Sequence, residues 1–171
     1  LTEIRKDSLV ELATLDHIAF LDQSELLPTD FYFSQQWNLH NRGLAQLKYD
    51  ADIDAPEAWH TQTGSSNVVV AVVDGGIFLE HPDLRNNLYI NPGEGATRDG
   101  IDNDNNGIID DIHGANFVAR TVDGKPTGDP TDLAINTHGH MVASIAVSSS
   151  NNAEGIAGVA WGSRLMFIQV F

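Results

Sequence analysis

The sequence carries its strongest structural signal in the run Val68-Val69-Val70-Ala71-Val72-Val73-Asp74-Gly75-Gly76. This run begins with apolar residues of strand length, shows no polar alternation, and ends on an aspartate followed by a glycine pair. Such a pattern predicts a strand buried on both faces, which is typical of parallel sheets. The glycine pair favours a tight turn after the strand. Asp74 is therefore expected at the carboxyl end of the strand, where α/β proteins commonly place functional groups.

The elements that follow this run predict an α/β fold. A helix is predicted from His138 to about Ser148, and residues 164–171 predict a second buried strand. A short strand is expected over residues 115–118. Strand, helix and strand in this order predict a mostly parallel sheet with flanking helices. The expected apolar face of the helix comprises Met141, Val142, Ile145 and Ala146.

The residues before the run predict shorter elements. A helix is expected over residues 6–15, a strand over residues 18–21, and an extended surface segment over residues 22–50. A further helix is expected to begin at Asp54, with Asp54 and Glu57 forming a capping box. The extended segment should be held in place by its aromatic rings, which belong to Phe31, Tyr32, Phe33 and Trp37.

Composition and charge restrict the possible partners. The 171 residues include 9 basic and 24 acidic side chains, for a net charge of −15, and no cysteine. This charge argues against binding to nucleic acid and is compatible with binding cations. The absence of cysteine excludes disulfides, thiolate zinc sites and a cysteine nucleophile. No apolar stretch is long enough to predict a membrane-spanning helix, so a membrane partner is not expected.

Asp74 and His138 are the strongest candidates for catalytic chemistry. His138 lies in the segment Thr137-His138-Gly139-His140-Met141-Val142-Ala143, where the expected helix begins. A carboxylate that accepts one imidazole N–H fixes the histidine tautomer, so that the other ring nitrogen can take a proton from a serine. Each of the two residues taken alone is equally compatible with a turn former or a helix cap.

Four blocks of sequence, in order, resemble the subtilisin-like serine peptidases, or subtilases. They are Asp74-Gly75-Gly76 after its strand, His81-Pro82-Asp83-Leu84, His138-Gly139 with Val142-Ala143, and Gly155-Ile156-Ala157-Gly158-Val159-Ala160. The resemblance covers about residues 30–171. It implies a partial subtilisin-like fold in which Asp74 is the orienting acid and His138 is the general base. The sequence departs from the family pattern at Gly75, which stands for Ser or Thr, and at His140, Met141 and Ser144, which stand for Thr, His and Gly.

The resemblance also implies a truncated catalytic domain. The serine nucleophile and the oxyanion-hole asparagine of the family come after the strand at 164–171, and Ser144 lies on the same helix as His138 and should not reach its imidazole. The helix and strand expected in residues 6–21 resemble the tail of a subtilase propeptide, and residues 28–39 resemble a mature subtilase N-terminus. We expect residues 1–27 to be the tail of a propeptide and residues 28–171 to be the N-terminal part of the catalytic domain. The chain alone should be inactive. Its parent would be a secreted bacterial zymogen that hydrolyses polypeptide substrates.

One acidic segment predicts a calcium site. It reads Asp99-Gly100-Ile101-Asp102-Asn103-Asp104-Asn105-Asn106-Gly107-Ile108-Ile109-Asp110-Asp111. Side chains at alternate positions aim their oxygens inward, and Gly107 permits a sharp turn. Oxygen ligands without cysteine favour calcium over zinc or copper. The alternative is a solvated acidic loop without a metal. The predicted ligands are Asp99, Asp102, Asp104, Asn106, Asp110 and Asp111, with the carbonyl oxygen of Ile108.

The resemblance supports the calcium site, since similar acidic loops occur in subtilases at this place in the chain. A second, weaker calcium site is implied at Asp83 and the loop 148–156, with Asn152 as its side-chain ligand. The remaining histidines of interest are expected to be ordinary polar residues rather than metal ligands. They are His81, His113 and His140.

The resemblance also places the strand at 164–171 between the strands at 115–118 and 68–73. The run Val68–Val73 would then lie at a sheet edge, although its sequence suits the centre of a sheet. Unpaired N–H and C=O groups on an apolar edge favour pairing with another chain. A homodimer or a swapped assembly through Val68–Val73 is therefore expected.

Two classes of function remain open from the sequence. The first is the N-terminal part of a calcium-binding, subtilisin-like serine endopeptidase. The alternative is a catalytically dead, calcium-binding subtilase-like module with a binding or inhibitory role. A different α/β hydrolase is disfavoured because the acid precedes the histidine and no Gly-x-Ser-x-Gly motif occurs.

Overall fold

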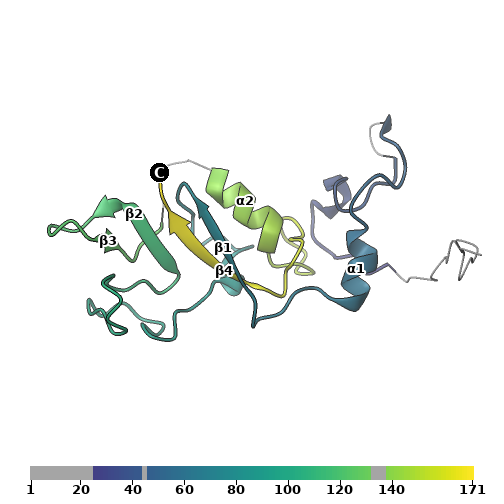
Figure 1. The fold of residues 1–171 in the computed structure, drawn as a ribbon. Helices are drawn as coiled ribbons and strands as arrows, with labels where there is room; N and C mark the ends of the chain where they lie inside the picture. The colour runs from purple at the N-terminus through teal and green to yellow at the C-terminus, as the bar shows by residue number, and fades with distance from the viewer. Residues whose placement is uncertain (1–24, 44–45, 132–137) are drawn as a thin grey trace, which may run out of the picture.

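The computed structural model describes residues 25–43, 46–131 and 138–171. The helix expected over residues 6–15 and the strand expected over residues 18–21 lie outside these ranges. Figure 1 shows a central sheet with one helix packed on it and a second helix in the N-terminal part of the chain. In chain order the elements are η2 (Phe33–Gln35), α1 (Ala55–Thr61), β1 (Val69–Asp74), η4 (Arg85–Asn87), β2 (Gly114–Arg120), β3 (Pro126–Thr127), α2 (His138–Val147) and β4 (Arg164–Gln169).

The four strands form one mostly parallel sheet in the order β1-β4-β2-β3. Strand β1 pairs in parallel with β4 from Val69↔Arg164 to Asp74↔Gln169, and β4 also pairs in parallel with β2. The short β3 pairs with β2 in the antiparallel sense. The predicted α/β class is confirmed. The expected position of the last strand is also correct, because β4 lies between β1 and β2 and leaves β1 at the edge of the described sheet.

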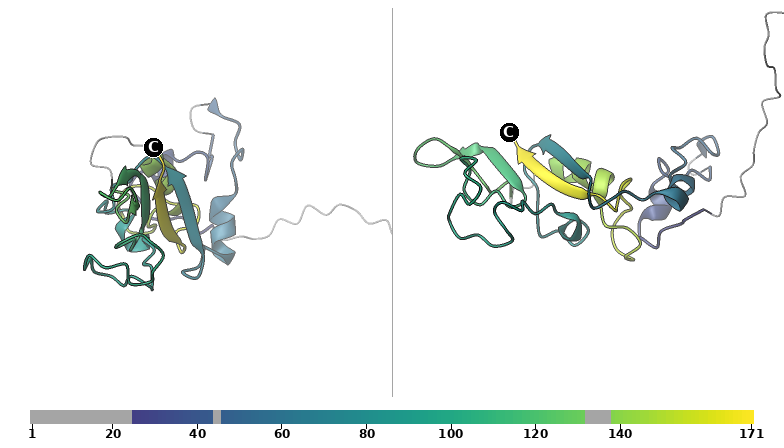
Figure 2. Two further views of the ribbon diagram at one scale, coloured as in Figure 1. Left: turned by 60° about the vertical axis from the view of Figure 1, so that its left-hand side comes forward. Right: turned by 60° about the horizontal axis from the view of Figure 1, so that its bottom comes forward.

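Helix α2 packs on one face of β1 and β4, as the views in Figures 1 and 2 show. Its small residues make this close contact possible: a Cβ atom added to Gly139 would lie 2.6 Å from Cζ of Phe167. The buried side of the helix consists of Gly139, Ala143, Ser144 and Val147. The predicted apolar face was therefore wrong. Met141, Val142 and Ile145 are 52%, 39% and 52% exposed, and from that set only Ala146 packs against the core.

Burial along β1 alternates, so the prediction of a strand buried on both faces was also wrong. Val72 and Asp74 are buried beneath α2, whereas Val69 and Val73 are exposed on the opposite face. The reason is that α2 covers one face of the sheet and β1 is an edge strand. The main core lies between α2 and this face of the sheet. It contains Val72, Ile77, Leu79, Leu84, Ala143, Val147, Leu165 and Phe167.

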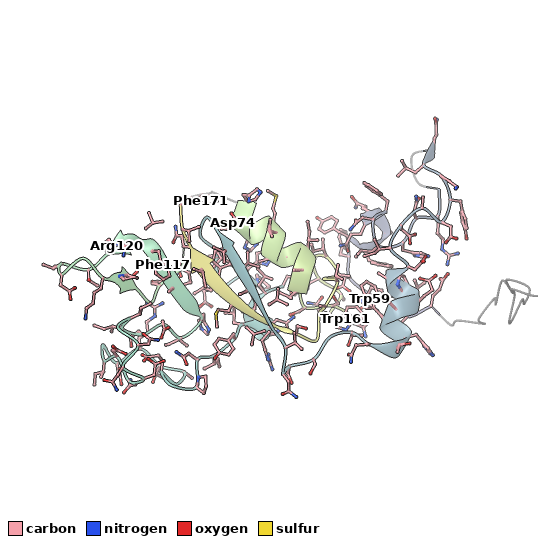
Figure 3. The ribbon with its side chains drawn as sticks, in the orientation of Figure 1. Trp59, Asp74, Phe117, Arg120, Trp161 and Phe171 are labelled. Carbon is pink, nitrogen blue, oxygen red and sulfur yellow. The ribbon has the colours of Figure 1, made fainter. Side chains whose placement is uncertain are left out.

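A second, smaller core joins α1 to the C-terminal loop. Trp59 stacks on Trp161 with ring centroids 4.6 Å apart, and its indole N–H donates to the carbonyl of Val159 (Figure 3). Of the aromatic rings expected to hold the N-terminal segment, Phe33 is buried in this core. The prediction was wrong for Phe31, Tyr32 and Trp37, which are exposed.

The start of α1 also differs from the sequence prediction. Asp54 has a positive φ of 53° and makes no side-chain capping hydrogen bond, so the capping box with Glu57 does not form. Asp52 replaces it locally, because its Oδ1 accepts the N–H of Asp54 at 2.7 Å. Pro56 lies in the first turn as expected, where its missing N–H costs nothing.

Candidate functional site

Asp74 and His138 meet at the carboxyl end of β1. Asp74 is the last residue of the strand and His138 is the first residue of α2, so the packing of α2 on the sheet brings the two side chains together. Nδ1 of His138 lies 2.9 Å from Oδ1 and 2.8 Å from Oδ2 of Asp74. A carboxylate only accepts hydrogen bonds, so Nδ1 carries the hydrogen and the tautomer is fixed.

The surroundings keep Asp74 ionised. The N–H of Gly75 donates to Oδ1 at 2.6 Å, and this bond, followed by the bond from His138, lowers the pKa of Asp74. The side chain of Asp74 is 10% exposed, whereas that of His138 is 66% exposed. A buried anion therefore holds an accessible imidazole whose Nε2 has no hydrogen-bond partner among the described residues. This is the arrangement that a general base requires.

Ser144, which follows His138 on the same helix, does not hydrogen-bond to the Asp74–His138 pair. The hydroxyl of Ser144 donates to the carbonyl of His140 at 2.8 Å, one turn back along α2. Within residues 25–43, 46–131 and 138–171, no serine hydroxyl hydrogen-bonds to His138. The described residues therefore supply an acid and a base without a partner hydroxyl.

A cluster of carboxylates lies in the loop between η4 and β2. Ligand atoms of Glu94, Asp104 and Asp111 all lie within 4.8 Å of one another. The amide of Asn91 bridges Asp104 Oδ2 and Asp111 Oδ1, each at 3.0 Å. Partial burial raises the pKa of Asp111, and the Asn91 amide is the main cause that lowers the pKa of Asp104. We call Glu94, Asp104 and Asp111 the loop site.

The other predicted ligands of this loop have different partners in the structure. Asp99, Asp102 and Asp110 accept hydrogen bonds from backbone N–H groups of the loop itself. Asn106 donates to Asp104 and Asp111, and the N–H of Ile108 donates to Asn106 Oδ1. The structure therefore brings Asp104 and Asp111 together and leaves the remaining predicted ligands as the frame of the loop.

Asp83 and Asn152 also meet, as the second expected site requires. Asn152 Nδ2 donates to Asp83 Oδ1 at 3.0 Å, and the N–H of Ile156 donates to Oδ2 at 2.9 Å. The loop passes so close that a Cβ atom on Gly155 would lie 2.1 Å from Asp83 Oδ2. This contact requires glycine at position 155, where φ is 46°.

Asp30 lies beside this pair and carries an unsatisfied oxygen. Its Oδ2 accepts the N–H of Asn151 at 2.7 Å, but its Oδ1 is buried and has no hydrogen-bond partner. Burial raises the pKa of Asp30, and the nearby carboxylate of Asp83 raises it further. A buried carboxylate oxygen without a donor is unfavourable unless a water molecule or a cation satisfies it. We call Asp30, Asp83 and Asn152 the junction site.

Comparison with known proteins assigns the family. A model described as the subtilase family matches residues 65–171, more than half of the chain. The chain belongs to the subtilase family. It is 39% identical over 137 residues to subtilisin-like protease 1 of Plasmodium berghei, covering 80% of this chain and 20% of that protein. It is 31% identical over 166 residues to an extracellular basic protease of Dichelobacter nodosus, covering 94% of this chain and 25% of that protein.

Solved structures give the same assignment. The subtilase chain is 28% identical to an Aeromonas sobria serine protease, solved with its chaperone, with a TM-score of 0.58 over 84% of this chain and 20% of that one. It is 27% identical to a Pseudoalteromonas arctica protease, with a TM-score of 0.55 over 84% of this chain and 39% of that one. The subtilase chain thus spans about a fifth to a quarter of the curated relatives named above. Among its described helices, none is long and apolar enough to cross a membrane.

Sequence reasoning missed two carboxylates of this subtilase chain. Glu94 lies five residues before the acidic segment, yet it is buried and accepts N–H groups of Asn103, Asp104 and Asp110. A single glutamate between two glycines gave no spacing signal. Asp30 meets Asn151 across a separation of 121 residues, which no local pattern can indicate.

Proposed function

We propose that this subtilase chain is the N-terminal part of the catalytic domain of a secreted serine endopeptidase. In this proposal Asp74 orients His138 and His138 acts as the general base. The observation that supports it is the contact of Nδ1 of His138 with both carboxylate oxygens of Asp74, at 2.9 and 2.8 Å. Residues 1–27 would be the end of a propeptide and residues 28–171 the start of the catalytic domain.

The proposed chemistry follows from this geometry. His138 Nε2 would take the proton of a serine hydroxyl as that oxygen attacks the carbonyl of a polypeptide substrate. Asp74 would remain ionised and stabilise the imidazolium, aided by the N–H of Gly75 on Oδ1. The serine, and the donors that stabilise the oxyanion, would come from a longer polypeptide. In such an active form, Asp74→Asn should lower kcat by about 10⁴-fold, the effect expected when the wrong tautomer is favoured.

The 171-residue chain by itself should be inactive, because its described residues place no serine hydroxyl on His138. The test is incubation with casein and with a fluorophosphonate that labels activated serines. We expect no turnover and no labelling, with an active subtilase as the positive control. Stoichiometric labelling of one serine would contradict this proposal. Inhibition of the active subtilase by the unreactive chain would instead support the alternative of a catalytically dead, inhibitory module.

The loop site is proposed to bind calcium. Its donors are carboxylate oxygens, the chain contains no cysteine, and such hard ligands suit calcium and magnesium rather than zinc or copper. Calcium is favoured over magnesium because it accepts more oxygen ligands in a less regular geometry, which suits donors from one irregular loop. The fit is supported by the crowding of three carboxylates, which accept hydrogen bonds from amide and backbone N–H groups but form no ion pair among the described residues. The junction site is proposed as a second calcium site because Asp30 Oδ1 is buried without a donor.

Self-association through β1 is also proposed. Residues Val68–Val73 carry no charge in a chain of net charge −15, and Val69 and Val73 are 39% and 58% exposed. A second copy could pair with this edge without bringing like charges together at the strand. Light scattering at high concentration should show a dimer, and Val73→Lys should make it a monomer. Val118→Lys, at an exposed valine on β2, is the matched control. A monomeric unmodified chain would contradict the proposal.

A further inference from the structure

A pocket at the amino ends of the parallel strands gathers positive charge in this acidic chain. It is lined by residues from the segment before β1, from η4 and the loop after it, and from the beginnings of β2 and β4. They include Ser66, Arg85, His113 and Arg164, and no aspartate or glutamate lines the pocket. The sequence has 24 acidic and 9 basic residues, so a pocket lined by two arginines and by no acidic residue differs from the overall composition.

The two arginines of this pocket have no acidic side chain as a partner within the described ranges. Among the described residues, Arg42, Arg98 and Lys125 pair with Glu25, Asp129 and Asp123, whereas Lys48 and Arg120 form no ion pair. In the part of the chain that the structure describes, neither Arg85 nor Arg164 forms an ion pair. Nη1 of Arg164 donates to the carbonyl of Asn86 at 2.8 Å, which fixes one end of its guanidinium and leaves other N–H groups for a ligand.

The wall of the pocket is held by the sheet. Leu88 forms a parallel bridge with Leu165, and the N–H of Tyr89 donates to the carbonyl of Leu165 at 2.7 Å. Nδ1 of His113 donates to the carbonyl of Tyr89 at 2.6 Å, which fixes the imidazole. The side chains that line the pocket are therefore presented by a backbone that is already ordered, so little conformational entropy is lost when a ligand binds.

We propose that this pocket binds an oxyanion, a carboxylate, phosphate or sulfate group, between Arg85 and Arg164. A guanidinium presents N–H donors in a planar fork that matches two oxygens of such a group, and charge-assisted bonds of this kind are the strong ones. The hydroxyl of Ser66 adds a neutral donor. β1 has six residues, so Asp74 lies about 20 Å from this end of the sheet. The site is therefore independent of the proposed catalytic pair.

The test is a titration of the 171-residue chain with sodium sulfate, with sodium chloride exchanged to keep the ionic strength constant. The Nε–Hε signals of Arg85 and Arg164 are followed by ¹H–¹⁵N NMR, and saturable shifts are expected. Arg85→Gln and Arg164→Gln should each weaken the affinity by roughly tenfold or more, because each removes a charged donor. Arg164→Lys keeps the charge and should bind more tightly than Arg164→Gln, and it serves as the folded variant if glutamine at this position unfolds the chain.

The matched control is Arg120→Gln. Arg120 is exposed at the far end of β2, next to β3 (Figure 3), and its substitution removes the same charge outside the pocket. It should leave the sulfate affinity within about twofold of the unmodified value. Shifts that never saturate, or an equal loss in Arg120→Gln and Arg85→Gln, would overturn the proposal. A short glutamate-rich peptide is the second arm: displacement of sulfate assigns the site to peptide carboxylates, and no displacement assigns it to a free oxyanion.

Discussion

The loop site and the junction site are both built from carboxylates, but they are assembled in opposite ways. In the loop site, Glu94, Asp104 and Asp111 belong to one continuous segment, and the amide of Asn91 holds two of them together. In the junction site, Asp30 and Asp83 come from distant parts of the chain, and a third part contributes Asn152. The first site depends on a local loop, whereas the second depends on the packing of three segments.

This difference has an electrostatic consequence. The oxygens of the loop site already accept hydrogen bonds from Asn91 and Asn106, so a bound cation there would replace existing interactions. In the junction site, Asp30 Oδ1 is buried and accepts no hydrogen bond, so a bound cation would displace no existing interaction of this atom. The loop site should therefore retain its shape without calcium. The junction site should be destabilising without calcium, because a buried charge lacks a counter-charge.

Glu94→Gln should give the largest effect. Glu94 is buried and accepts three backbone N–H groups, and glutamine would turn a donor toward the N–H of Asp110 or toward the N–H groups of Asn103 and Asp104. Calcium present at 100 times its dissociation constant contributes about 2.7 kcal/mol to the free energy of unfolding at one site. We expect a loss of about 4–5 kcal/mol in calcium and about 1–2 kcal/mol in chelator, measured by urea unfolding.

The control for Glu94→Gln is Glu80→Gln, which removes the same charge from an exposed position outside both sites. It should change the free energy of unfolding by less than about 0.5 kcal/mol under both conditions. Equal losses for Glu94→Gln in calcium and in chelator would mean that Glu94 is structural and that the loop site holds no calcium.

The two sites also show which features could be predicted from the sequence and which could not. The apolar run predicted β1, and the order of elements predicted the parallel sheet, because both depend on residues adjacent in sequence. The buried face of α2 was predicted wrongly because Gly139 and Ala143, which are weak hydrophobic signals, are the residues that allow close approach to Phe167. Asp104 and Asp111 followed from local spacing. Asp30 did not, because its partners are brought to it only by the packing of the loop around residue 151 on the N-terminal segment.

Asp30→Asn tests the junction site and should change sign with calcium. In chelator the substitution removes a buried charge without a counter-charge, and the free energy of unfolding should rise by about 1 kcal/mol. In calcium it removes a ligand, and a loss of about 2 kcal/mol is expected. Asp50→Asn is the matched control, since Asp50 is exposed and its positive φ of 62° suits asparagine. Destabilisation by the same amount in both conditions would show that Asp30 is only a structural acceptor for Asn151.

Asp74→Asn tests a third carboxylate, which differs from those of the two proposed calcium sites. Its charge is stabilised by hydrogen bonds from Gly75 and His138 rather than by a proposed metal ion. The pKa of Asp74 is lowered, first by the N–H of Gly75 and then by His138, from an ordinary value of 3.8. A lowered pKa means that the stabilisation by the carboxylate is fully present above pH 3.8 and is lost as the pH falls through the lower value of the folded chain. The unmodified chain should therefore be more stable than Asp74→Asn by about 1–2 kcal/mol at neutral pH, and this difference should shrink below pH 3.8.

Urea unfolding of both proteins across this pH range isolates the effect of Asp74, because the other acidic residues are common to both proteins. Because Gly75 and His138 supply the balancing interactions, the difference between the two proteins should be the same in calcium and in chelator. A difference that depends on calcium would show that Asp74 is coupled to one of the two proposed calcium sites, and the proposed independence of these sites from the Asp74–His138 pair would then be wrong.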